Sequence, residues 1–230
     1  MTCRAIIWCG FIKKSLGVIE ANIFRNDIEL AIAAARHRHV HPQDVFALVC
    51  DPELLPQGFS GQVLPATLES LEAVTRSIAQ VATPDDCLLW IATNHGDLDG
   101  LLIETEPLDE FAEDDAPRFL SPDLLARYLD PLPGNQIGII ATCYAGIFSP
   151  LANQRRAMFT ACGPRDVYIV DYGDLHPSRS PFLYEMLSHW AGVSLGNYAA
   201  PARSSISEAF GIIEPDFPGC DSAGDASWPD

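Results

Sequence analysis

Short runs of consecutive hydrophobic residues alternate along the chain with longer segments of helical periodicity. The hydrophobic runs have the length of strands and predict them at residues 4–11, 44–50, 87–92, 137–142 and 157–162. The periodic segments predict helices at residues 26–38, 67–84, 121–129 and 180–190. Continuous hydrophobic strands are typical of sheets that are covered on both faces. The order of elements therefore predicts an α/β protein of three layers, α/β/α, with a mostly parallel central sheet.

Polar residues at the starts of the predicted helices can cap them. Asn26 or Asp27 stands at the start of the first helix, Thr67 at the second and Ser121 at the third. Such side chains accept hydrogen bonds from the first free amides of a helix. Residues 52–61 are rich in Pro and Gly, which predicts a turn region between the second strand and the second helix.

The charge of the chain is strongly negative. Its 230 residues include 14 Lys and Arg against 31 Asp and Glu, for a net charge of −17. Nucleic acids and anionic membrane surfaces would repel such a protein, so we expect neither as a partner. No apolar run approaches the roughly 18 residues of a membrane span, and residues 1–8 lack the pattern of a signal peptide. We therefore expect a cytoplasmic protein, and nothing in the composition predicts a metal or another cofactor.

Acidic residues concentrate in two segments. Seven lie within residues 104–115, and five lie within residues 214–230, where Lys and Arg are absent. The first segment lacks the spaced ligands and the glycine of a calcium loop, so we interpret it as a solvated loop. The second also carries three prolines, which predicts a disordered tail. Residues 1–213 are expected to form a single domain.

The cysteines are scattered and odd in number. The seven positions are Cys3, Cys9, Cys50, Cys87, Cys143, Cys162 and Cys220. Their spacing, without a C-x-x-C pair, argues against a disulfide framework and against a zinc site. Most of them neighbour apolar residues, so six are expected to be small buried packing residues. Cys143 has a different context.

His95 and Cys143 follow the ends of two successive predicted strands. Residues 93–97 read Thr-Asn-His-Gly-Asp, and residues 141–146 read Ala-Thr-Cys-Tyr-Ala-Gly. Functional groups gather beyond the carboxyl ends of parallel strands, so neighbouring strands would bring the imidazole and the thiol together. A thiolate attacks a carbonyl carbon, and an imidazole protonates the leaving amine. Gly96 permits a close backbone approach, and its amide and that of Cys143 can form an oxyanion hole.

A simpler interpretation exists for each residue taken singly. A His-Gly pair after a strand is commonly a turn, and a cysteine in an apolar context is commonly a core residue. Both at successive strand ends, 48 residues apart, is a rarer coincidence and favours nucleophilic chemistry.

The same two segments resemble motifs of the caspase-like cysteine peptidases of clan CD. Residues 94–102, Asn-His-Gly-Asp-Leu-Asp-Gly-Leu-Leu, are similar to the His-Gly-x-x-Gly-Leu/Ile-Leu segment of the legumain-like family and its small bacterial relatives. Residues 141–148, Ala-Thr-Cys-Tyr-Ala-Gly-Ile-Phe, resemble the Ala-Cys-Tyr-Ser-Gly-x-Phe of the bacterial forms. The resemblance covers residues 4–190 and is specific around these two motifs only.

The resemblance implies a caspase-like fold and a cysteine endopeptidase. His95 would be the catalytic histidine, and Cys143 the nucleophile that forms a thioester acyl-enzyme with a protein or peptide substrate. The amides of Gly96 and Cys143 would supply the oxyanion hole. Transpeptidation by the same acyl-enzyme is a variant of this chemistry, since relatives of the clan also pass the acyl group to an amine.

Substrate preference does not transfer from the family, because two of its motifs are altered. The position two before the nucleophile lines the specificity pocket and is often Gln, Glu or Asp, whereas here it is Ala141. Residues 166–169 replace the family's Ser-Tyr/Phe-x-Cys segment. Arg25 and Asp174 are the candidate pocket charges, with an exposed charge and an Asx turn as their simpler interpretations. Asn22 is a candidate for orienting the catalytic histidine.

Two further interpretations of the whole chain stay open. The altered pocket motifs are also consistent with a catalytically silent caspase-like module that binds partners, and a closed, short cleft would favour a small-molecule amidohydrolase. The histidines and arginines of residues 36–41 resemble a metal-ligand set, but they are better interpreted as an exposed helix end.

Overall fold

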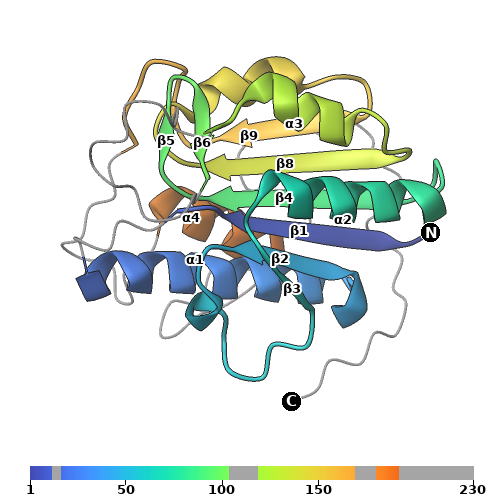
Figure 1. Ribbon diagram of the computed structural model, residues 1–230, viewed down its shortest axis with the longest axis horizontal. Helices are drawn as coiled ribbons and strands as arrows, with labels where there is room; N and C mark the ends of the chain where they lie inside the picture. The colour runs from blue at the N-terminus through green and yellow to red at the C-terminus, as the bar shows by residue number, and fades with distance from the viewer. Residues whose placement is uncertain (12–16, 104–118, 169–179, 192–230) are drawn as a thin grey trace.

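The computed structural model describes residues 1–11, 17–103, 119–168 and 180–191. Six parallel strands form a central sheet in the order β3-β2-β1-β4-β8-β9 (Figure 1). The strands are β1 (Cys3–Cys9), β2 (Val45–Val49), β3 (Gln62–Pro65), β4 (Cys87–Thr93), β8 (Asn135–Ala141) and β9 (Arg156–Thr160). The α-helices in these ranges are α1 (Gly17–His37), α2 (Leu68–Val81), α3 (Pro122–Leu129) and α4 (Pro181–Ala191).

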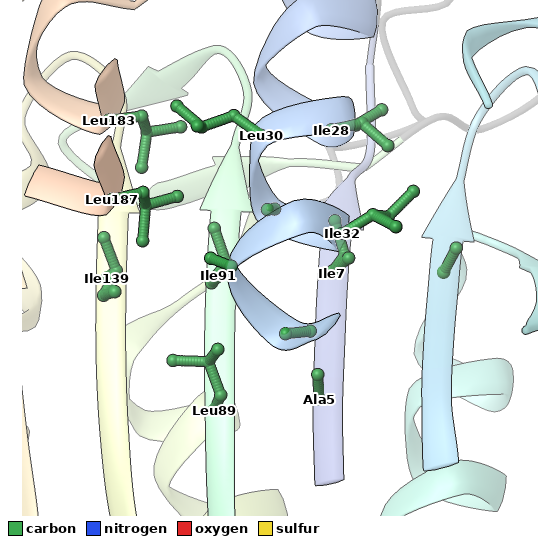
Figure 2. Close-up of a cluster of buried hydrophobic side chains, with 14 of the residues drawn as sticks. Ala5, Ile7, Ile28, Leu30, Ile32, Leu89, Ile91, Ile139, Leu183 and Leu187 are labelled. Atoms are coloured by element: carbon green, nitrogen blue, oxygen red, sulfur yellow. The ribbon is translucent and has the colours of Figure 1, made fainter. Parts of the chain in front are cut away.

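The helices cover both faces of the sheet and create two hydrophobic layers. On one face, α1 and α4 pack over the strands, and Figure 2 shows Leu187 of α4 beside Ile139 of β8. On the other face, α2 and α3 enclose the second layer, which contains the tilted pair Trp8 and Trp90 with ring centroids 6.0 Å apart. The central strands can be hydrophobic on both sides because helices cover both faces of the sheet there. The predicted three-layer α/β fold is confirmed.

Helix starts were predicted with mixed success. Thr67 and Ser121 do cap α2 and α3, where their side chains accept hydrogen bonds from backbone amides three residues later. The prediction that Asn26 or Asp27 starts the first helix is wrong, because α1 begins at Gly17. Asp27 lies within α1, and its carboxylate is fully buried and bonded to other segments of the chain.

Short elements were not predicted. The edge strand β3 contains only four residues and is mostly exposed, so it lacks a hydrophobic signal. A second, antiparallel sheet is formed by β5 (Gly96–Asp97), β6 (Gly100–Leu102) and β7 (Phe119–Leu120). The 3-10 helices η2 (Pro42–Asp44), η3 (Pro52–Leu54) and η4 (Ala145–Leu151) occupy other connections. Elements this short show no periodicity in the sequence.

The prediction that Cys3 and Cys87 are only packing residues is wrong. They face each other on the neighbouring strands β1 and β4 with their Cα atoms 4.6 Å apart, and their sulfurs form a disulfide. Cys9 is a buried core residue as expected, and Cys50 and Cys162 are half-buried free thiols. Strand register decides this pairing, because residues 84 positions apart meet only when β1 and β4 align.

A buried ion-pair network lies at the same end of the sheet. Asp86 accepts hydrogen bonds from the amides of Thr2 at 2.6 Å and Thr83 at 3.0 Å, and from the Arg4 guanidinium at 3.2 Å. Burial alone would raise the pKa of Asp86, but these donors together lower it below its ordinary value of 3.8. Arg4 also pairs with Asp44 at 3.5 Å. The network holds the amino end of β1 against the start of β4.

The predicted exposed helix end at residues 36–41 is confirmed for its main members. Arg36 and His37 form the last turn of α1, and both are exposed, as is His39. Although His37 is exposed, the protein still covers part of its side chain, and this desolvation lowers its pKa together with the charges of Arg38 and His39. Within the described ranges, no helix combines the length and hydrophobicity that a membrane crossing requires. The acidic segment 104–115 and the tail 214–230 lie outside the described residues, so the predictions for both segments and the single-domain boundary at 213 stay predictions.

Candidate active site

The end of β4 and the end of β8 lie side by side at one edge of the sheet. The two strands are parallel neighbours, and Thr93 is paired with Ala141 in their register. His95 and Cys143 each follow two residues after this pair, and both line a cavity of about 120 Å³. The structure therefore brings together the imidazole and the thiol that the sequence placed on successive strand ends.

Aromatic contacts hold the His95 ring. The imidazole is half-buried and meets Phe11 and Phe24 edge to face, with centroids 5.9 Å and 5.6 Å away. Phe24 belongs to α1, whereas Phe11 follows β1, so two elements define the orientation of the ring. Such edge-to-face pairs are worth about 0.5–1.5 kcal/mol each. The backbone oxygen of His95 accepts a hydrogen bond from Leu102 of β6 at 3.0 Å.

Asn94 fastens the histidine segment to its surroundings. Its side-chain oxygen accepts a hydrogen bond from the Phe11 amide at 2.9 Å, and its side-chain nitrogen donates to the Leu102 carbonyl at 2.5 Å. The Asn94 amide also donates to the Ala141 carbonyl at 3.4 Å. Asn94 thus connects the end of β4 to the segment after β1, to β6 and to the end of β8. It belongs to the His-Gly motif of the sequence, but no role was predicted for it.

The nucleophile candidate Cys143 lies in a tight turn between β8 and η4. Its half-buried thiol donates a hydrogen bond to the Tyr168 carbonyl, with sulfur and oxygen 3.6 Å apart. The next residue, Tyr144, adopts the left-handed conformation with φ of 57°, which is uncommon for a residue other than glycine. The Tyr144 amide donates to the Asp166 carbonyl at 2.8 Å, which secures the turn. A turn of this kind presents the thiol at the strand end.

Gly96 lies directly against the backbone of the nucleophile segment. A Cβ atom at this position would stand 2.5 Å from the Thr142 hydroxyl oxygen and 2.6 Å from the Cys143 carbonyl oxygen. Only a residue without a side chain allows this approach. The backbone of Gly96 is therefore close to that of Cys143, as an oxyanion hole built from their two amides requires.

Of the candidate substrate-binding residues, one lines the cavity, one does not, and one lies outside the described residues. Ala141 is buried and lines the cavity together with His95 and Cys143. Arg25 does not line it, because its guanidinium donates to the Glu53 carbonyl at 3.2 Å and 3.4 Å and to the Asn22 side-chain oxygen at 3.3 Å. Asn22, the candidate for orienting the histidine, does not line the cavity either. Asp174 lies outside the described residues.

Among the cavity residues for which the sequence predicted no role in the site are Asp27, Tyr168 and Ser180. The pKa of the Tyr168 hydroxyl is raised, chiefly by burial and also by the charge of Asp27, whereas its hydrogen bonds with Ser180 and Phe182 oppose the rise. A signal for Asp27 existed, since it falls on the helical stripe of Phe24, Ile28 and Ala31. A carboxylate on an apolar stripe indicates a buried acid with specific partners.

The site shows no sign of holding a metal ion with its described residues. Within the parts of the chain that the structure describes, no group of three or more His, Cys, Asp or Glu side chains could hold a metal. The chemistry that the arrangement offers is that of a thiol and an imidazole that line one cavity beside the backbone of Gly96.

Comparisons with protein-family models and with curated sequences identify no relative. No protein-family model matches the chain, and no curated protein matches its sequence. The likeness to caspase-like peptidases therefore depends on the two motifs alone, and the family stays a prediction.

Proposed function

We propose that this protein is a cysteine endopeptidase of the caspase-like type, with legumain-like motifs, that hydrolyses peptide bonds through His95 and Cys143. One observation carries the proposal. The strand ends that hold these residues are neighbours in the sheet, in a register that pairs Thr93 with Ala141, and both side chains line one cavity. Residues 48 positions apart in the sequence reach this arrangement only through the parallel pairing of β4 and β8.

The proposed reaction uses groups at this edge of the sheet. The Cys143 sulfur, as thiolate, attacks the carbonyl carbon of the peptide bond while the imidazole of His95 carries the thiol proton. The amides of Gly96 and Cys143 donate to the oxygen of the tetrahedral intermediate. His95 protonates the leaving amine as the carbon–nitrogen bond breaks, which leaves a thioester. Water then attacks the thioester while His95 takes up a proton from it. The carbon–sulfur bond breaks, the acid product leaves, and the proton returns from His95 to the sulfur of Cys143.

Cytoplasmic location belongs to the same proposal, and one observation counts against it. Disulfides are rare in reducing compartments and persist in oxidising ones, and the structure contains the Cys3–Cys87 disulfide. Mass spectrometry of the protein trapped with an alkylating reagent directly in its host cells decides the matter. Two free thiols at these positions support a reducing compartment, and an intact disulfide contradicts it.

A peptide library tests the activity. We expect the purified protein to cleave a subset of peptides, and Cys143→Ala to reduce the rate at least about a thousandfold because the nucleophile is lost. Cys50→Ala is the matched control, since Cys50 is also a half-buried free thiol but lies outside the cavity. No cleavage by the wild type, or equal cleavage by Cys143→Ala, contradicts the proposal. An added amine that captures the acyl group would show transpeptidation.

Thiol reactivity separates the enzyme from a silent binding module. An electrophilic peptide is expected to label Cys143 much faster than Cys50 in the same molecule, because the His95 imidazole lines the same cavity and can accept the thiol proton as the sulfur attacks. Equal labelling of the two thiols would favour the non-catalytic module instead.

A further inference from the structure

A fully buried carboxylate lies in the wall of the cavity, on the side formed by α1. Asp27 is 0 % exposed and lines the cavity together with His95 and Cys143. We propose that Asp27 is a positioning residue that holds the histidine segment and the nucleophile segment in their working arrangement. This inference rests on the proposed cysteine chemistry and adds a residue that the motif comparison did not identify.

The first contact of Asp27 reaches the histidine side of the site. One carboxylate oxygen accepts a hydrogen bond from the Thr93 hydroxyl at 2.7 Å, and both side chains are buried. Thr93 is the last residue of β4 and stands two positions before His95. The contact therefore attaches the end of β4 to α1, the helix that also supplies Phe24 against the imidazole.

The second contact reaches the nucleophile side through two further residues. The other carboxylate oxygen of Asp27 accepts a hydrogen bond from the Ser180 amide at 2.8 Å. The Ser180 hydroxyl is hydrogen-bonded to the Tyr168 hydroxyl at 2.8 Å, and that hydroxyl accepts from the Phe182 amide at 2.8 Å. The carbonyl of Tyr168 in turn accepts the hydrogen bond from the Cys143 thiol.

These contacts form one chain from the imidazole segment to the thiol. Asp27 joins Thr93, 66 residues away, with Ser180, 153 residues away. The segments that carry these two groups also meet through the pairing of β4 with β8 and through the approach of Gly96 to Thr142 and Cys143. Asp27 adds a side-chain link between them from behind the cavity.

Fold stability by itself gives little reason for a carboxylate here. Asp27 lies in a layer to which α1 contributes apolar residues such as Phe24, Ile28 and Ala31. Burying a carboxylate costs free energy unless specific donors compensate, and well-packed apolar residues often serve stability equally well. A carboxylate has two oxygens that can accept from two separate donors at once. At Asp27 these donors are the Thr93 hydroxyl and the Ser180 amide, so the side chain holds two segments at one point.

The test uses variants that differ in one buried hydroxyl. Thr93→Val removes the bond to Asp27 and keeps the size of the side chain, and Thr93→Ser keeps the hydroxyl. Thr75→Val is the matched control, because Thr75 is also buried and its hydroxyl donates to the Leu71 carbonyl at 2.8 Å within α2, outside the cavity. Asp27→Ala removes both contacts, but it leaves two buried donors unpaired. If that variant does not fold, the comparison of Thr93→Val with Thr93→Ser decides the question.

Three measurements are made on each variant: kcat and KM for a cleaved peptide, the rate of Cys143 alkylation by iodoacetamide relative to that of Cys50, and the melting temperature. We expect Thr93→Val to lower kcat about tenfold to a hundredfold, since small misplacements of reactive groups have effects of this size. KM should stay within about threefold of the wild type, because the substrate contacts remain. Thr93→Ser should recover most of the lost kcat, and both valine variants should lose similar thermal stability.

A purely structural role would make Thr93→Val behave like Thr75→Val in kcat and in alkylation, and that result overturns the inference. A rise in KM with unchanged kcat also overturns it, because Asp27 and Thr93 would then act on the substrate. If the wild type cleaves no peptide, the proposed function fails separately. The alkylation rates then decide alone: slower reaction of Cys143 in Thr93→Val but not in Thr75→Val supports positioning, and equal rates refute it.

Discussion

Replacing Gly96 by alanine tests the close approach on which the proposed oxyanion hole depends. The added Cβ atom would stand 2.6 Å from the Cys143 carbonyl oxygen, whereas real Cβ atoms essentially never come closer than 3.0 Å to a neighbour. The nucleophile backbone must therefore retreat by at least 0.4 Å, and the Thr142 hydroxyl at 2.5 Å must move as well. Gly96 does not have a positive φ, so the effect comes from crowding and not from backbone strain.

The expected loss of activity follows from this displacement. Misplacement of reacting groups by about 1 Å costs up to about a hundredfold in rate, so a smaller shift predicts a fall of roughly tenfold or more in kcat/KM. The free energy of unfolding should also fall, by about 1–3 kcal/mol, because the added methyl group overpacks a filled site. The backbone amide of residue 96 is retained, so a loss of rate would report the position of the amide and not its removal.

Gly138→Ala is the control for crowding without displacement of the site. Its Cβ atom would meet the sulfur of Met158 at 2.5 Å, and this is the flexible end of a side chain that can move away. Peptide cleavage, Cys143 alkylation and thermal unfolding are measured for both variants. We expect both to lose stability, and only Gly96→Ala to lose activity. Equal activity of the two variants would refute the proposed role of the close approach.

Two further predictions concern stability. The Cys3–Cys87 disulfide joins residues 84 positions apart. Its removal by Cys87→Ser or by reduction should therefore lower the free energy of unfolding by about 2–4 kcal/mol. A urea midpoint of the wild type that does not change when reductant is added would contradict the bond. The folded-state pKa of Asp86 lies below 3.8, so its contribution is present above that pH and is lost as pH falls through the folded pKa, with a slope of at most about 1.4 kcal/mol per pH unit. In urea titrations at several acidic pH values, Asp86→Asn should make the free energy of unfolding depend less on pH. Substitution of the exposed neighbour Asp85 should not have this effect. Equal pH dependence of the two variants would refute the role given to Asp86.

Local patterns predicted most of the central architecture. The continuous hydrophobic runs at 87–92 and 137–142 became β4 and β8 with small shifts, because a strand covered on both faces must be apolar along its length. Thr67 and Ser121 cap their helices because capping involves only neighbouring backbone amides. The juxtaposition of His95 and Cys143 at one sheet edge was also accessible, since it needs only that two successive strands be parallel neighbours.

Long-range contacts decided the rest. Asp27 looked like a helix cap, but its carboxylate bonds to Thr93 and Ser180, which no local pattern relates to it. Arg25 looked like a pocket charge, and the path of α1 directs its guanidinium to the Glu53 carbonyl. The disulfide depends on the register of β1 against β4. The sequence alone determined the layers, the strand ends and the placement of His95 and Cys143 beyond those ends, because hydrophobic burial and capping follow local periodicity. Only the tertiary structure decided which buried polar side chains are bonded around these two residues, because buried hydrogen bonds depend on positions set by the whole fold.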